Sequence, residues 1–200
     1  MRLLPIALLL TAACGGRQIQ NLPLTWRGVN DLPAPSASVA QSFATAPIAF
    51  GLRDVRPDPS AVGTYEDNGF VVRTSDNVAE FCAARMGEML ARAGARLHEA
   101  PVTILEAELV EYRVVEGGTF NGLVRIRAIV RHDGGNAAWS KTYVGKSRRW
   151  GRSHSPENFN EALSNALADA ATQLVGDDEF AQALVSGGPP MQAPGAPAGG

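Results

Sequence analysis

The residues best suited to binding chemistry form a short basic run before the last predicted helix. The run contains Arg148, Arg149, Trp150 and Arg152, and Lys146 precedes it. An arginine presents a planar fork of donors that fits phosphate or carboxylate, and a tryptophan ring can stack on a sugar or a base. We expect the run to lie in an exposed strand-to-helix connection. Two interpretations stay open: a solvated loop, or a surface that contacts an anionic lipid, a glycan or a protein partner.

A second candidate for partner binding is the pair Asp54 and Arg56, which follows the first predicted strand. Two opposite charges in a turn can form an ion pair that holds the loop, or they can present a binding motif. Pro57 and Pro59 follow, and proline is typical of turns. We favour the structural ion pair and keep partner binding as the alternative.

Residues with catalytic or metal-binding potential are present, but their spacing forms no known site. The three histidines are His98, His132 and His154. No His-Glu-x-x-His, Cys-x-x-Cys or Gly-x-Ser-x-Gly pattern occurs. Glu106 and Glu108 share a strand face and Glu111 follows, but a general acid needs a cleft that separates two pKa values. We therefore interpret these carboxylates as a solvated sheet face and expect no catalytic residue, metal or cofactor.

The first of the two cysteines, Cys14, stands in a secretory context. It follows Arg2, an apolar segment at 3–10 and a few small residues, and this segment is shorter than the about 20 residues of a membrane span. The cysteine after small residues resembles the bacterial lipoprotein signal, although Thr11 stands where leucine is preferred. The resemblance implies removal of residues 1–13 and acyl groups on Cys14 as a membrane anchor. The alternative is an ordinary secretory signal.

The other cysteine, Cys82, falls in a helical apolar pattern and is expected to be a small buried core residue. Acylation of Cys14 would leave it without a disulfide partner. Gly15, rather than aspartate, follows Cys14. By resemblance to the sorting rule of enteric bacteria, this favours the outer membrane, with the domain on its periplasmic face.

Length and composition fit one globular domain with flanking segments. The chain has 200 residues, of which 45% are hydrophobic and 19% charged. A net charge of −2 and a pI near 5.9 argue against nucleic-acid binding through bulk charge. We expect a tether at 14–46, a domain at 47–185 and a disordered Gly/Pro/Ala tail at 186–200. Leu22, Leu24 and Trp26 interrupt the tether, and we prefer docking on the domain to contact with a membrane interface.

Hydrophobic periodicity predicts the element order β-α-β-β-β-α. The elements cover residues 48–53, 77–93, 102–115, 123–131, 137–146 and 155–174, and a short helix follows at 179–185. Ser75 or Asp76 caps the first helix, and Gly94 ends it with a positive φ. A bulge near Val110 reconciles two alternation patterns within its strand. Residues 62–70 are a polar loop or a short hairpin.

Two helices with one apolar stripe each can cover one face of a sheet. We therefore expect a two-layer α+β sandwich, in which two helices cover an antiparallel sheet of about four strands. Ser155 at the N-cap and Pro156 at the first helical position begin the last long helix.

The order of these parts resembles the YajG-type bacterial lipoproteins over roughly residues 48–184. The resemblance rests on the Asp54–Pro57 turn, the 77–93 helix and the closing 163–184 stretch with its break at Gly176. It implies an envelope lipoprotein and carries no established activity. In fold the family is distantly similar to lipoprotein modules that activate peptidoglycan synthases, which is a weak functional argument.

The leading hypothesis is a non-enzymatic, lipid-anchored envelope protein whose periplasmic domain binds a protein or cell-wall partner such as peptidoglycan. The alternative is an accessory lipoprotein of an exporter, or a carrier that holds a lipid or small ligand in a closed apolar cavity. An enzyme is the least favoured class.

Overall fold

The computed structural model describes residues 18–28, 34–98, 103–132, 135–151 and 154–185. The predicted signal segment, Cys14, Arg152 and the predicted tail at 186–200 lie outside them. No helix within the described residues is long and apolar enough to cross a membrane.

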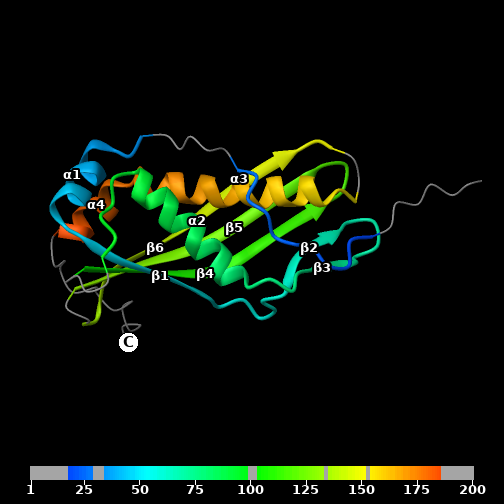
Figure 1. Cartoon of the computed structure of the whole chain (residues 1–200), viewed down its shortest axis with the longest axis horizontal. Helices are drawn as coiled ribbons and strands as arrows, with labels where there is room; N and C mark the ends of the chain where they lie inside the picture. Colours follow the sequence, from blue (N-terminus) through cyan, green and yellow to red (C-terminus); the bar gives the residue numbers. More distant parts are fainter. Residues whose placement is uncertain (1–17, 29–33, 99–102, 133–134, 152–153, 186–200) are drawn as a thin grey trace, which may run out of the picture.

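Over the described residues, a six-stranded sheet and four helices make up the two layers (Figure 1). The strands are β1 (Ile48–Asp54), β2 (Ala61–Tyr65), β3 (Val71–Arg73), β4 (Thr103–Glu116), β5 (Phe120–His132) and β6 (Ala137–Arg149). The helices are α1 (Ala37–Thr45), α2 (Val78–Arg92), α3 (Pro156–Val175) and α4 (Asp178–Val185). The predicted two-layer α+β sandwich is confirmed, with more strands than expected.

The sheet is mixed rather than wholly antiparallel. Strands β4, β5 and β6 form the predicted antiparallel meander, and β2 and β3 form a hairpin. β1 and β2 both run parallel to β4. The expectation of an antiparallel sheet is wrong here because β1 reaches β4 through helix α2, and such a crossover brings two strands side by side in the same direction.

β1 and β2 share one edge of the long strand β4. β1 pairs with its first half, from Thr103 to Leu109, and β2 pairs with its last residues, from Val114 to Glu116. The predicted bulge is confirmed, because the register between β4 and β5 shifts at Val110. The extra residue keeps the apolar side chains on both sides of it directed to the helices.

The helix ends follow the sequence signals closely. Asn77, rather than Ser75 or Asp76, caps α2 and accepts a hydrogen bond from the Glu80 backbone. Asp76 instead accepts the Leu24 N–H at 2.7 Å. Gly94 has φ +97° after α2, and Ser155 with Pro156 begins α3, both as predicted.

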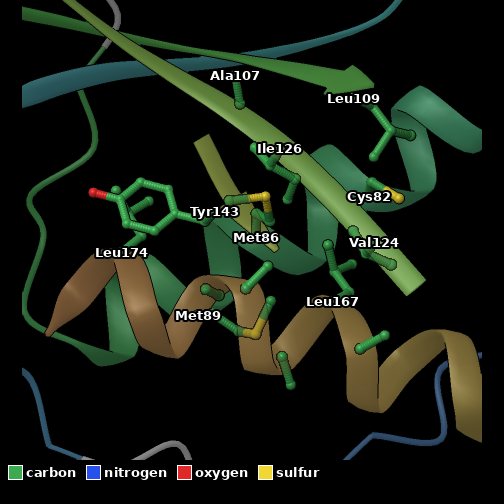
Figure 2. Close-up of a cluster of buried hydrophobic side chains, with 14 of the residues drawn as sticks. Cys82, Met86, Met89, Ala107, Leu109, Val124, Ile126, Tyr143, Leu167 and Leu174 are labelled. Carbon is green, nitrogen blue, oxygen red and sulfur yellow. The ribbon is translucent and has the colours of Figure 1, made fainter. Parts of the chain in front are cut away.

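The core lies between α2, α3 and the inner face of the sheet. Figure 2 shows side chains from both helices meeting those of β4, β5 and β6. It labels Cys82, Met86, Met89, Ala107, Leu109, Val124, Ile126, Tyr143, Leu167 and Leu174, all of them buried. The prediction that Cys82 is a buried core residue is confirmed.

The first described segment packs on the domain, so the predicted docking is confirmed. Leu22 is fully buried and its N–H donates to the Arg73 carbonyl. The backbone of Thr25 donates to the Asn160 side chain, and that of Arg27 donates to the Ser164 hydroxyl, both on α3.

Residues 37–45 differ from the expected tether, because they form helix α1. Ser36 caps it, and the Phe43 ring packs edge-on against Phe180 of α4 at 6.1 Å between centroids. The apolar spacing of Val39 and Phe43 is helical, but the helix is short and depends on α4 for burial.

Two strand glycines let α3 lie directly on the sheet. A Cβ at Gly145 of β6 would meet the carbonyl oxygen of Ala166, and one at Gly122 of β5 would meet that of Ala162. These are backbone atoms of a packed helix, so they cannot move aside. By contrast, a Cβ at Gly51 of β1 would meet nothing within 4 Å.

We therefore expect Gly145→Ala to lower the free energy of unfolding by at least about 1–3 kcal/mol, because the added methyl group overpacks the contact between β6 and α3. Gly51→Ala is the matched control and should change stability by less than about 1 kcal/mol, with a gain expected from a stiffer unfolded chain. Urea unfolding measures both. Equal effects of the two substitutions would contradict the close packing of α3.

Candidate functional site

The basic run is not a loop, because β6 extends through it to Arg149. Strand alternation sends its two adjacent arginines to opposite faces. Arg149 turns toward α3, where its Nε donates to Asn158 at 3.0 Å and its guanidinium pairs with Glu161. Arg148 lies on the other face, with its guanidinium 5.5 Å from the centre of the Trp150 ring. Trp150 is 71% exposed.

The face of the sheet away from the helices carries a hollow of about 550 Å³ beside Arg148. Its lining comprises Arg113, Val115, Asn121, Gly122, Leu123, Lys146, Ser147 and Arg148, and we call it the basic hollow. These residues belong to the ends of β4 and β6 and the start of β5. Pairing between the strands places Asn121 beside both Val115 and Arg148, and Leu123 beside both Arg113 and Lys146.

The charges around the basic hollow are mostly positive. Arg113 pairs with Glu111 at 2.6 Å, and Glu111 also lies 3.4 Å from Arg125. Within the described residues, the side-chain cations of Lys146 and Arg148 form no ion pair with a carboxylate. The Asp169 carboxylate on α3 accepts the backbone N–H of Lys146 at 2.8 Å. Two exposed cations without acidic partners, over a partly apolar floor of Val115 and Leu123, form a site that can accept an anion.

The remaining charges on this face are engaged with one another. Glu108 pairs with both Arg53 and Arg127, and its side chain is only 3% exposed. Glu106 lies 3.0 Å from Arg131. The expectation of solvated carboxylates is wrong for Glu108, because arginines from β1 and β5 cover it. The three glutamates that could have formed a catalytic carboxylate pair, Glu106, Glu108 and Glu111, each form an ion pair with an arginine.

Asp54 and Arg56 lie almost buried at the gap between β1 and β2. Arg56 grips both carboxylate oxygens of Asp54, with Nε to Oδ1 at 2.9 Å and Nη2 to Oδ2 at 2.7 Å. Its Nη1 donates to the carbonyls of Ala61 at 2.7 Å and Tyr112 at 3.2 Å. The side chains are 6% and 10% exposed for Arg56 and Asp54. This geometry fits the favoured interpretation, a structural ion pair. Direct partner binding by Asp54 and Arg56 stays a prediction.

Cys82 lies behind this ion pair, next to Tyr112. Burial raises the pKa of the Cys82 thiol and of the Tyr112 hydroxyl well above their ordinary values. A nucleophilic cysteine needs the opposite shift and access to solvent. The thiol therefore serves packing.

Two of the histidines have structural neighbours. The His132 ring lies between the Thr103 hydroxyl at 3.1 Å and the Ala183 carbonyl at 2.9 Å. The His154 ring lies 4.8 Å from that of Tyr65. Within the described ranges, no three His, Cys, Asp or Glu side chains gather closely enough to hold a metal ion.

Comparison with known proteins finds similarity to solved structures. Protein XCC0632 from Xanthomonas campestris, of the DUF330 family, has a TM-score of 0.53 at 12% identity, over 80% of this chain and 93% of that one. The likeness is one of fold. A Caulobacter crescentus protein that is assigned to the lipoproteins has a TM-score of 0.45 at 13% identity, over 75% of this chain and 98% of that one. No family model and no curated protein matches. These comparisons show the fold alone, and the YajG-type assignment stays a prediction.

The Asp54–Arg56 pair generates a test of its structural role. Replacing Arg56 with Ala leaves the Asp54 carboxylate buried without its partner, so we expect a loss of about 3–5 kcal/mol of stability. The matched control is Arg73→Ala, because Arg73 forms an exposed ion pair with Asp58. That change should cost about 0–1 kcal/mol. Denaturant unfolding measures the stability of both variants. If Arg56→Ala unfolds at the same denaturant concentration as the parent protein, the structural role is excluded.

Proposed function

We propose that this chain is a non-enzymatic, lipid-anchored envelope protein that binds an anionic partner at the basic hollow. One observation carries the proposal. The side-chain cations of Lys146 and Arg148 lie exposed on the same face and form no ion pair with a carboxylate of the described residues, and the Trp150 ring beside Arg148 is 71% exposed. Glu106, Glu108 and Glu111 on the same face of β4 are each paired with an arginine, so the Lys146 and Arg148 side chains have positive charge left for a partner.

The anchor rests on the signal-like segment that ends at Cys14. Diacylglyceryl and amino-terminal acyl groups on this cysteine would hold the protein stably, since two acyl signals suffice. Gly15 after the cysteine supports the periplasmic face of the outer membrane as the location. An envelope protein or the cell wall is then within reach of the domain.

The absence of an enzymatic role is part of the proposal and is supported by how the reactive side chains are used. Cys82 is buried with a raised pKa, and Glu106, Glu108 and Glu111 each contact an arginine. The carrier alternative requires a closed apolar cavity. The basic hollow is an open surface, and the space between α2, α3 and the sheet is filled by side chains (Figure 2).

Replacing Cys14 with Ser tests the anchor. The parent protein, with Cys14 in place, should incorporate labelled fatty acid and stay with membranes. The Cys14→Ser variant should lose the label and move to the soluble periplasmic fraction. Fractionation with radiolabelled palmitate measures both. A Cys14→Ser protein that remains in the membrane fraction would disprove lipid anchoring at this residue.

Crosslinking in cells tests the partner. A photoreactive residue at exposed Asn121, which lines the basic hollow, should yield a discrete adduct, and Lys146→Ser combined with Arg148→Ser should reduce it at least about tenfold. The control places the same photoreactive residue at exposed Glu80 on α2. Mass analysis identifies the adduct as protein, glycan or lipid. An adduct that persists in the double variant, or none at all, would refute partner binding at the hollow.

A further inference from the structure

The basic hollow lies at the end of the domain from which the chain leads back to Cys14. The Ile19 N–H donates to the Tyr65 hydroxyl at 3.1 Å, and Tyr65 pairs with Glu116 at the end of β4. Across the sheet Glu116 pairs with Phe120, and Phe120 pairs with Arg149 at the end of β6. In Figure 1 the blue segment that begins at residue 18 and the arrowheads of β4 and β6 lie on the same side of the molecule.

The distance from this end to the anchor is short. Cys14 and Gln18 are four peptide units apart, and at about 3.8 Å per unit the chain spans at most about 15 Å between them. The predicted tether of about 30 residues would have allowed the domain to range freely. Docking of Ile19 and Leu22 removes that freedom. An acylated Cys14 therefore holds this end of the sheet next to the bilayer surface.

The side chains at this end suit a membrane surface. Lys146 and Arg148 are exposed cations, and each lysine or arginine near an anionic leaflet contributes about 1 kcal/mol of attraction. Tryptophan is enriched at the membrane interface, where its ring meets both headgroups and acyl chains. Trp150 is 71% exposed and neighbours Arg148. Bulk charge does not explain such an attraction, because the whole chain has a net charge of −2.

We propose that the basic hollow binds the phosphate groups of anionic lipids in the leaflet to which Cys14 is anchored. The inference rests on the proposed function and names the anionic partner of the same site. Arg148 and Lys146 would contact headgroup phosphates, Val115 and Leu123 would contact the glycerol region, and Trp150 would enter the interface. Lipid is favoured over a protein or cell-wall partner because at most about 15 Å of chain separates an anchored Cys14 from Gln18, where the chain reaches this end of the domain.

Vesicle binding tests the inference without the anchor. The mature chain, residues 14–200 with Cys14→Ser, keeps every described residue. It is mixed with phosphatidylcholine vesicles that contain either no or about 30% phosphatidylglycerol, and sedimentation gives the partition constant. We expect binding only to the anionic vesicles, weaker at higher salt. Lys146→Ser with Arg148→Ser should lower the constant about 25-fold, at roughly fivefold per charge.

Arg92→Ser with Arg96→Ser is the matched control. Both arginines are exposed, and the Arg96 carbonyl binds Ile48 at the opposite end of the sheet. This variant loses the same charge and should keep its partition constant within about twofold. Circular dichroism shows whether both variants are folded. Tryptophan fluorescence gives a second readout, since a blue shift on anionic vesicles should vanish in Trp150→Phe.

The outcomes distinguish lipid binding at the basic hollow from the more general proposal that the hollow binds an anionic partner. Equal binding of parent and Lys146→Ser/Arg148→Ser protein to anionic vesicles, or an equal loss in the control, would overturn the lipid assignment. Displacement from vesicles by millimolar inorganic phosphate at constant ionic strength would also overturn it, in favour of free phosphate. A protein or cell-wall adduct at Asn121 without vesicle binding would leave the proposed function standing and remove the inference. Loss of the adduct altogether would remove both.

Discussion

The ion pair between Asp54 and Arg56 holds together the edge on which the sheet is built. β4 is long enough to accept two strands on one edge, and β1 and β2 occupy its two ends. Between them its backbone would be left without partners inside a nearly dry region. The Arg56 guanidinium fills this gap by bonding the Tyr112 carbonyl of β4 and the Ala61 carbonyl of β2. Asp54 at the end of β1 balances the buried charge.

Strand alternation gives the two faces of this sheet different side chains and different roles. The inner face carries apolar residues and the glycines that admit α3, so its role is packing. The outer face carries arginines and glutamates that neutralise one another along β4 and β5. The pairing ends before the last residues of β6, where the side chains of Lys146 and Arg148 form no ion pair with any carboxylate of the described residues. The candidate site is thus the place where a balanced charge pattern stops.

Local signals in the sequence predicted most elements, including the bulge at Val110, the Gly94 helix end and the Ser155 cap. They failed where the deciding contacts are distant. The direction of β1 depends on the crossover through α2, and α1 is stable only against α4. Burial of Glu108 depends on arginines from two other strands. Alternation alone separates Arg148 from Arg149, but the predicted strand ends at Lys146, three residues before the observed end of β6.

Docking of the first described segment also fixes the order in which the protein can be completed. The Pro23 carbonyl and the backbone of Thr25 and Arg27 bond to side chains of α3, at separations of 135 to 137 residues. These bonds cannot form until α3 has been synthesised. Contacts between such distant residues are slow to form. The first described segment therefore stays undocked until nearly all of the domain has been made, and the last step of folding joins residues 23–27 to the last long helix.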